Sequence, residues 1–209
     1  MAELITGLDA GRIRENLARV REELPDHVQV LAAVKYVPLD ELGTLQDAGI
    51  ELVGENRAQD LEAKATAHPD LRWHFIGQLQ SRKVKVILPY VELIHSVASD
   101  SALRQLAKHG TPDTKILVEV NTAGEEDKAG IAPEELGPFI ERCPVTVTGL
   151  MTMPPYTEDP EASRPHFAAL KRLADEHGLD ELSMGTSQDY RVAAEEGATI
   201  VRLGTSLYA

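Results

Sequence analysis

The sequence contains very little cysteine and no excess of positive charge. Cys143 is the only cysteine in 209 residues, which excludes an intrachain disulfide and a cysteine-based zinc or iron–sulfur site. Lys and Arg number 21 against 34 Asp and Glu, so the net charge is −13. Because a protein that follows a nucleic-acid backbone needs an excess of basic residues, this composition argues against a nucleic-acid partner.

Long apolar runs and closely spaced histidines are missing as well. No apolar run is long enough to span a membrane, and residues 1–12 lack the basic and then apolar layout of a secretory signal. The seven histidines are scattered, so we expect no metal site. These absences predict a cytoplasmic protein.

What the sequence does contain is a regular alternation of short strand-like runs and helical patterns. The first helix, 9–24, places Ile13, Leu17 and Val20 at helical spacing behind a capping Asp9. The predicted strands are 28–34, 50–53, 73–76, 93–97, 115–120, 145–150, 182–184 and 199–203. The remaining predicted helices begin at about Pro38 and span 57–67, 81–88, 100–109, 133–142, 161–177 and 190–196.

This alternation predicts a (β/α)8 TIM barrel that spans residues 1–209 as a single domain, with an extra N-terminal helix. A doubly wound open sheet is the competing fold. We favour the barrel because the count of strands reaches eight. The functional side chains should then lie at the carboxyl ends of the strands.

Lys35 follows the first predicted strand, in the run Ala33-Val34-Lys35-Tyr36. If the end of this apolar strand buries the lysine, its ammonium costs free energy unless an opposite charge or hydrogen-bond acceptors compensate it. Burial would favour the neutral amine, which is a nucleophile toward an aldehyde or ketone. The alternative is a strand-end lysine whose ammonium reaches solvent.

Other polar positions in the first half of the chain give weaker signals. Asn56, in Gly54-Glu55-Asn56, could bind a ring substituent, but a turn and a helix cap explain it equally well. His74 lies in the third strand without a second histidine three or four residues away, which favours a structural role. The acidic segment 121–130 is either a lid or a solvated surface loop.

Two late segments are rich in Gly, Ser and Thr. They are Ser183-Met184-Gly185-Thr186-Ser187 and Val201-Arg202-Leu203-Gly204-Thr205-Ser206. Barrels of this kind frequently bind phosphate with the loops after strands seven and eight, and Arg202 is placed to act as a fixed cation. An amine on the first strand that faces a phosphate site fits a Schiff base with a phosphorylated aldehyde or ketone. Pyridoxal 5′-phosphate and a sugar phosphate in an aldolase are both candidates.

Several separate motifs, in order along the chain, resemble those of one known family. The matching stretches are residues 33–37, 54–57, 73–80, 121–130, 149–154, 182–185, Asp189 and 201–205. Over essentially its whole length the chain resembles the pyridoxal phosphate homeostasis proteins, which are single-domain relatives of the alanine racemase barrel.

The resemblance implies a role for each cofactor-binding residue. Lys35 would form the aldimine with pyridoxal 5′-phosphate, and Arg202 would face the pyridine nitrogen. Because an arginine will not accept the ring proton, the cofactor would be a weaker electron sink than one paired with a carboxylate. Ser187, Gly204 and Thr205 would hold the phosphate, and Asn56 would lie near the ring. The expected cofactor-binding residues are Lys35, Asn56, Gly185, Ser187, Arg202, Gly204 and Thr205, with no catalytic or metal-binding residue.

Three positions depart from what is common in that family. Val34 stands where Ser or Thr is common, Arg82 where Asn is frequent, and Thr186 where Met is common. These departures affect the expected geometry around the cofactor and remove none of the residues that would bind it.

Two kinds of function remain open at this point. The first is a cofactor carrier that takes part in vitamin B6 homeostasis, with little catalysis and with apo pyridoxal phosphate enzymes as recipients. The second is an enzyme, either an amino-acid racemase or a Schiff-base aldolase. The racemase relatives supply a second base from a separate domain. Because this sequence ends at Ala209, soon after the eighth strand, we favour a carrier and expect a monomer.

Overall fold

The computed structural model describes residues 4–125 and 128–209. Its strands form one closed parallel barrel in which each strand pairs with the next in sequence and β8 pairs with β1. This closure confirms the (β/α)8 barrel, and the open-sheet alternative is wrong. The strands are β1 Gln29–Ala33, β2 Leu52–Glu55, β3 Arg72–Phe75, β4 Leu93–Val97, β5 Lys115–Glu119, β6 Thr146–Met151, β7 Glu181–Ser183 and β8 Ile200–Leu203.

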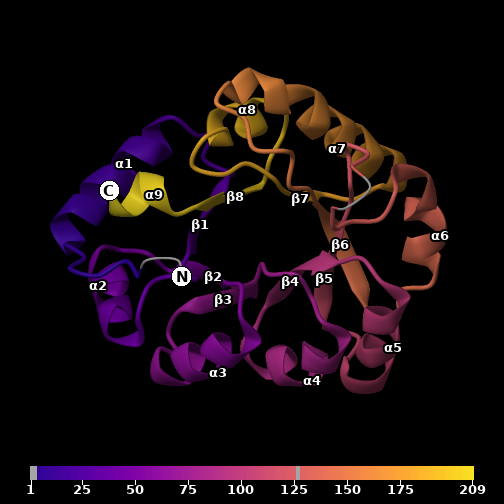
Figure 1. The fold of residues 1–209 in the computed structure, drawn as a ribbon, viewed down its shortest axis with the longest axis horizontal. Coiled ribbons are helices and arrows are strands. Elements are labelled where there is room, and N and C mark those ends of the chain that lie inside the picture. The colour runs from indigo at the N-terminus through magenta and orange to yellow at the C-terminus, as the bar shows by residue number, and fades with distance from the viewer. Residues whose placement is uncertain (1–3, 126–127) are drawn as a thin grey trace.

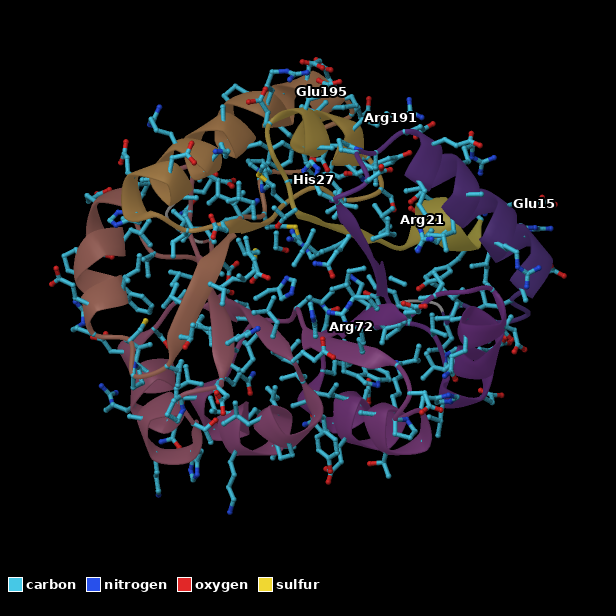
Figure 2. All side chains as sticks on the ribbon, turned by 180° about the vertical axis from the view of Figure 1, so that it is seen from behind. Glu15, Arg21, His27, Arg72, Arg191 and Glu195 are labelled. Carbon is cyan, nitrogen blue, oxygen red and sulfur yellow. The ribbon has the colours of Figure 1, made fainter. Side chains whose placement is uncertain are left out.

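The helices surround the barrel (Figure 1). Seen from behind, Arg191 and Glu195 of α8 lie on the outer rim of this ring (Figure 2). Among the described residues, no helix is long and apolar enough to cross a membrane. The helices are α1 Ala10–Glu22, α2 Leu42–Asp47, α3 Ala58–Ala67, α4 Val84–Ile87, α5 Asp100–His109, α6 Leu136–Glu141, α7 Arg164–His177, α8 Tyr190–Glu195 and α9 Thr205–Tyr208.

Several predicted helices begin with a separate 3-10 turn. Proline is present in the first turn of some of these segments, where its missing N–H costs nothing. The 3-10 segments are η1 Leu39–Glu41, η2 Ser81–Lys83, η3 Leu88–Tyr90, η4 Pro133–Glu135 and η5 Pro160–Ser163.

The first helix, α1, and the last helix, α9, pack together on the outside of the barrel. The predicted cap of α1 is confirmed, since the Asp9 carboxylate accepts the Arg12 N–H at 2.7 Å. The short helix α9 lies beside α1 (Figure 1), and Asn16 Nδ2 donates to the Leu207 carbonyl at 3.0 Å. The sequence did not predict α9, because four residues are too few to show a helical period.

Side chains of the strands divide between two apolar clusters because successive residues point to opposite faces of a strand. The larger cluster lies between the strands and the helices. The smaller one lies inside the barrel and consists of Leu31, Leu52, Leu93, Leu117, Met151 and Ile200. The strands also carry buried polar side chains, among them His74, His95 and Arg202.

One glycine keeps β6 and β7 close together. A Cβ at Gly149 would lie 1.8 Å from the carbonyl oxygen of Glu181, its partner in the strand register. We predict that Gly149→Ala lowers the free energy of unfolding by about 1–3 kcal/mol, because backbone atoms must move apart. Denaturant unfolding measures this loss.

Gly43 supplies the matched control. It lies inside α2, and a Cβ there would meet nothing within 4 Å. Gly43→Ala should leave stability unchanged or raise it by up to about 1 kcal/mol, as alanine favours a helix. Equal effects of the two substitutions would contradict the packing argument.

Candidate functional site

A pocket of about 320 Å³ opens at the carboxyl ends of the strands. It collects residues from both ends of the sequence, since β1 and β8 are neighbours in the closed barrel. The residues that line it are Ile5, Ala33, Lys35, Tyr36, Asn56, Ile76, Met153, Thr186, Ser187, Gln188, Arg202, Gly204 and Thr205. All the expected cofactor-binding residues except Gly185 are therefore brought together.

Lys35 stands at the mouth of this pocket, after the end of β1. Its side chain is exposed, and its ammonium nitrogen lies 4.7 Å from the centroid of the Tyr36 ring. Of the two alternatives for Lys35, the structure agrees with the strand-end lysine that reaches solvent. The face of the Tyr36 ring attracts the ammonium by a cation–π interaction.

Asn56 enters the pocket from the end of β2. Its Oδ1 is buried and has no hydrogen-bond partner in the structure. A buried acceptor that is left without a donor costs free energy. Asn56 therefore places an unpartnered acceptor beside the pocket.

The two late loops are joined through one hydroxyl. Ser187 Oγ accepts the backbone N–H of Gly204 at 3.1 Å and that of Ser206 at 3.2 Å. It also forms a hydrogen bond with Ser206 Oγ at 3.0 Å. Two backbone donors of one loop thus converge on the Ser187 hydroxyl of the other, beside the pocket. A Cβ at Gly204 would meet nothing within 4 Å, so this side is open.

Gly185 supports the pocket from below. Its φ of +90° is a conformation that favours glycine, and a Cβ there would lie 2.5 Å from the Cβ of Ala193. Its carbonyl accepts the backbone N–H of Arg202 at 3.0 Å. Gly185 therefore holds the start of one late loop against the strand that carries Arg202.

Arg202 is a buried cation at the base of the pocket. Its guanidinium donates to Ser183 Oγ at 2.5 Å, to the Thr152 carbonyl at 3.1 Å and to Met153 Sδ at 3.6 Å. Burial lowers the pKa of Arg202 to about 10, and the nearby charge of Glu119 opposes that shift. The side chain stays protonated at neutral pH. Burial in turn raises the pKa of Glu119.

Two histidines continue this polar chain into the barrel. His95 Nδ1 lies 2.8 Å from Ser183 Oγ, and His95 Nε2 lies 2.9 Å from His74 Nδ1. Because Arg202 only donates to Ser183, the serine hydroxyl is free to donate to His95, and His95 Nε2–H can then donate to His74. Every bond in the chain is satisfied with both rings neutral.

The interpretation of His74 as an isolated histidine is wrong. Its partner lies on the neighbouring strand, and a search for spacings of three or four residues cannot find a contact across a sheet. Among the described residues, no cluster of His, Cys, Asp or Glu could hold a metal ion. The structural role favoured for His74 agrees with its place in this chain.

Burial keeps both rings unprotonated in the folded protein. It lowers the pKa of His74 from 6.5 to about 3, with a smaller contribution from Arg72. It lowers the pKa of His95 well below 6.5, and the neighbouring His74 and Arg202 add to this. Below pH 6.5 the unfolded chain takes up protons at these histidines and the folded protein does not. Acid therefore favours unfolding over this range.

We predict that His74→Gln makes stability less sensitive to acid. From pH 6.5 down to about 4, the wild type should lose up to about 1.4 kcal/mol per pH unit through this histidine. The variant should lose correspondingly less, as urea unfolding at several pH values would show. His27→Gln, at an exposed histidine (Figure 2), is the control. Identical pH slopes in all three proteins would contradict the account.

The described residues of the acidic segment 121–130 do not line the pocket. Asn121 organises this segment, since its Oδ1 accepts the Gly124 N–H at 3.0 Å and its Nδ2 donates to the Glu125 carbonyl at 2.7 Å. Residues 126 and 127 of this segment lie outside the described residues. The lid and the favoured alternative, a solvated surface loop, both remain predictions.

The positions that depart from the expected motifs all find local partners. The Thr186 N–H and hydroxyl both donate to Asp189 Oδ1. The Arg82 side chain donates to Gln80 Oε1, and the Val34 carbonyl accepts from Lys64. None of these contacts closes the pocket.

Comparison with known proteins agrees with this fold. Residues 8–209 match the family model described as the N-terminal domain of alanine racemase. The pyridoxal phosphate homeostasis protein of Aquifex aeolicus is 43% identical over 195 residues, which cover 86% of each chain.

Solved structures of related proteins share this barrel fold. PipY of Synechococcus elongatus PCC7942, determined with pyridoxal phosphate bound, is 32% identical and has a TM-score of 0.82, with coverage of 94% of this chain and 100% of PipY. Alanine racemase of Clostridium difficile 630 is 14% identical with a TM-score of 0.78, and the match covers 96% of this chain and 57% of the racemase. At that identity the racemase shows a shared fold only.

Fold and site together define a (β/α)8-barrel protein with a lysine and two donor-rich loops around one mouth. The chain belongs to the pyridoxal phosphate homeostasis protein family, and its barrel is that of the alanine racemase N-terminal domain.

Proposed function

We propose that this protein binds pyridoxal 5′-phosphate at the mouth of its barrel and acts in intracellular vitamin B6 homeostasis, with little or no catalysis. The observation that carries the proposal is the pocket itself, where an amine on one side faces converging backbone donors on the other. The PipY structure with pyridoxal phosphate bound supports it, as does the identification of the relatives as pyridoxal phosphate homeostasis proteins.

The proposed attachment is a Schiff base on Lys35. The amine nitrogen adds to the aldehyde carbon, and one water molecule leaves as the C=N bond forms. The exposed position of Lys35 suits a cofactor that must enter and leave. When bound, the cofactor supplies an electron-accepting ring, and the residues of this chain decide how far that property is used.

The other site residues bind and orient the cofactor. Ser187, Gly204 and Thr205 would hold the phosphate, where the two backbone N–H groups converge. Asn56 would accept a hydrogen bond from the ring substituents with its unpartnered Oδ1. The Gly185 carbonyl accepts a hydrogen bond from the Arg202 backbone N–H and so helps to hold Arg202 in place.

Arg202 is the residue that limits catalysis. It would face the pyridine nitrogen as a protonated guanidinium, which donates hydrogen bonds and has no proton to give up near neutral pH. The ring nitrogen then stays unprotonated, and stabilisation of a carbanion is weak.

An amino-acid racemase or a Schiff-base aldolase is the alternative function. Racemisation needs a second base on the face of the cofactor opposite Lys35. Tyr36 lies directly beneath the Lys35 ammonium and so shares its side of the pocket. Tyr208 donates to the Ala33 carbonyl, and burial raises its pKa. Neither tyrosine supports the enzymatic alternative.

Absorption spectroscopy tests the binding proposal. Addition of pyridoxal 5′-phosphate to the wild-type protein should give a Schiff-base band that is lost in Lys35→Ala. The exposed lysine of Lys85→Ala provides the control for reaction at the surface, and that variant should keep the band. A wild-type protein that stays colourless, or a band of full strength in Lys35→Ala, would refute the proposed attachment.

Two assays separate the carrier from the enzyme. We expect the loaded protein to activate an apo pyridoxal phosphate enzyme on mixing, and chiral analysis of L-alanine incubated with it to show no D-alanine at enzymatic rates. Turnover at such rates would contradict the carrier function. The monomeric state and the cytoplasmic location stay predictions.

A further inference from the structure

A buried ion pair lies directly behind the pocket. Lys64 Nζ on α3 and Glu55 Oε2 at the end of β2 are 2.6 Å apart, and their side chains are only 8% and 0% exposed. Removal of two charges from water costs several kcal/mol per ion, and an apolar pair of similar volume often serves stability equally well. Stability alone therefore does not account for the pair.

The Lys64 ammonium holds the peptide that carries Lys35. It donates to the Val34 carbonyl at 2.7 Å, one residue before the amine of the pocket. β1 ends at Ala33, and its ladder with β2 joins only two residue pairs. Beyond that ladder, the Val34 N–H donates to the Gly54 carbonyl at 2.9 Å, and the ion pair supplies a second anchor on the other side of the same residue.

The Glu55 carboxylate holds the neighbouring wall of the pocket, since β2 pairs with β1. Its second oxygen, Oε1, accepts the backbone N–H of Asn56 at 2.6 Å and that of Arg57 at 3.0 Å. The Asn56 peptide also packs closely against Gly77, where a Cβ would lie 2.0 Å from the Asn56 carbonyl oxygen. One carboxylate thus joins the Lys64 anchor to the residue with the unpartnered Oδ1.

We propose that Glu55 and Lys64 are positioning residues that set the Lys35 backbone relative to the neighbouring Asn56 segment in the wall of the cofactor pocket. This proposal rests on the proposed function of Lys35 and Asn56 in binding pyridoxal 5′-phosphate. Since the strand end and the loop share one buried ion pair, neither wall can shift without loss of bonds to the other. The pair orders the pocket before the cofactor arrives, which reduces the entropy lost on binding.

The double variant Glu55→Gln/Lys64→Met tests this directly. It removes both charges and the bond to Val34, while the new amide can still accept from the Asn56 and Arg57 N–H groups. We expect a folded protein that binds pyridoxal 5′-phosphate about tenfold or more weakly, from titration of the Schiff-base band. Without cofactor, amide hydrogen exchange should be faster in residues 33–37 and 55–57 than in the wild type.

Lys171→Met is the matched control, because it removes a lysine from an exposed ion pair with Asp175 on α7. It should bind and exchange like the wild type. If the double variant does not fold, Glu55→Asp replaces it. This variant keeps both charges but shortens the side chain by one methylene, and it is tested by the same titration and hydrogen-exchange measurements. Wild-type affinity in a folded pair variant overturns the proposal. If the wild type itself gives no Schiff-base band, the proposed function fails, and the exchange comparison alone decides whether the pair orders these segments.

Discussion

Closure of the parallel strands into a barrel is the constraint on which every other feature of this protein depends. It makes β8 the neighbour of β1 and places Leu31 opposite Arg202 in the register (Figure 1). Lys35 follows one of these strands and Gly204 the other, so residues from the two ends of the sequence share one mouth. An open sheet would leave the two strands at separate edges and divide the pocket.

The same closure makes the barrel interior a costly place for charge. The structure reduces this cost in two ways. The histidines inside the barrel stay neutral and hydrogen-bonded, while Arg202 keeps its charge among several acceptors. Lys64 and Glu55, behind the pocket, neutralise one another. In a chain with a net charge of −13, an anionic ligand must be attracted by local groups, and Lys35, Arg202 and the backbone donors of the late loops are the groups at the mouth.

Much of the fold could be predicted from sequence, because each strand and helix leaves a local pattern. Apolar β-branched runs marked the strands, and helical spacing marked α1. That the loops after β7 and β8 would line a pocket could be predicted because sites in such barrels lie at the carboxyl ends of the strands. The helix α9 was too short to show a period.

The contacts between strands could not be predicted in this way. The strands are buried on both faces, so the inward and outward positions look alike in sequence. For that reason the link from Arg202 through Ser183 to His95 and His74 was missed. The alternation of residues that share a barrel face would have been the signal, and it becomes readable only when the register is known. Lys64 was missed for a related reason, since its partner Glu55 lies on another element and a lysine in a helix usually faces solvent.

The most direct test of the account is to locate the cofactor on the chain. The protein would be loaded with pyridoxal 5′-phosphate, reduced with borohydride, digested and mapped by mass spectrometry. The account predicts one dominant pyridoxyl-lysine, at Lys35. A label distributed over surface lysines with none enriched at Lys35, or no label at all, would contradict it.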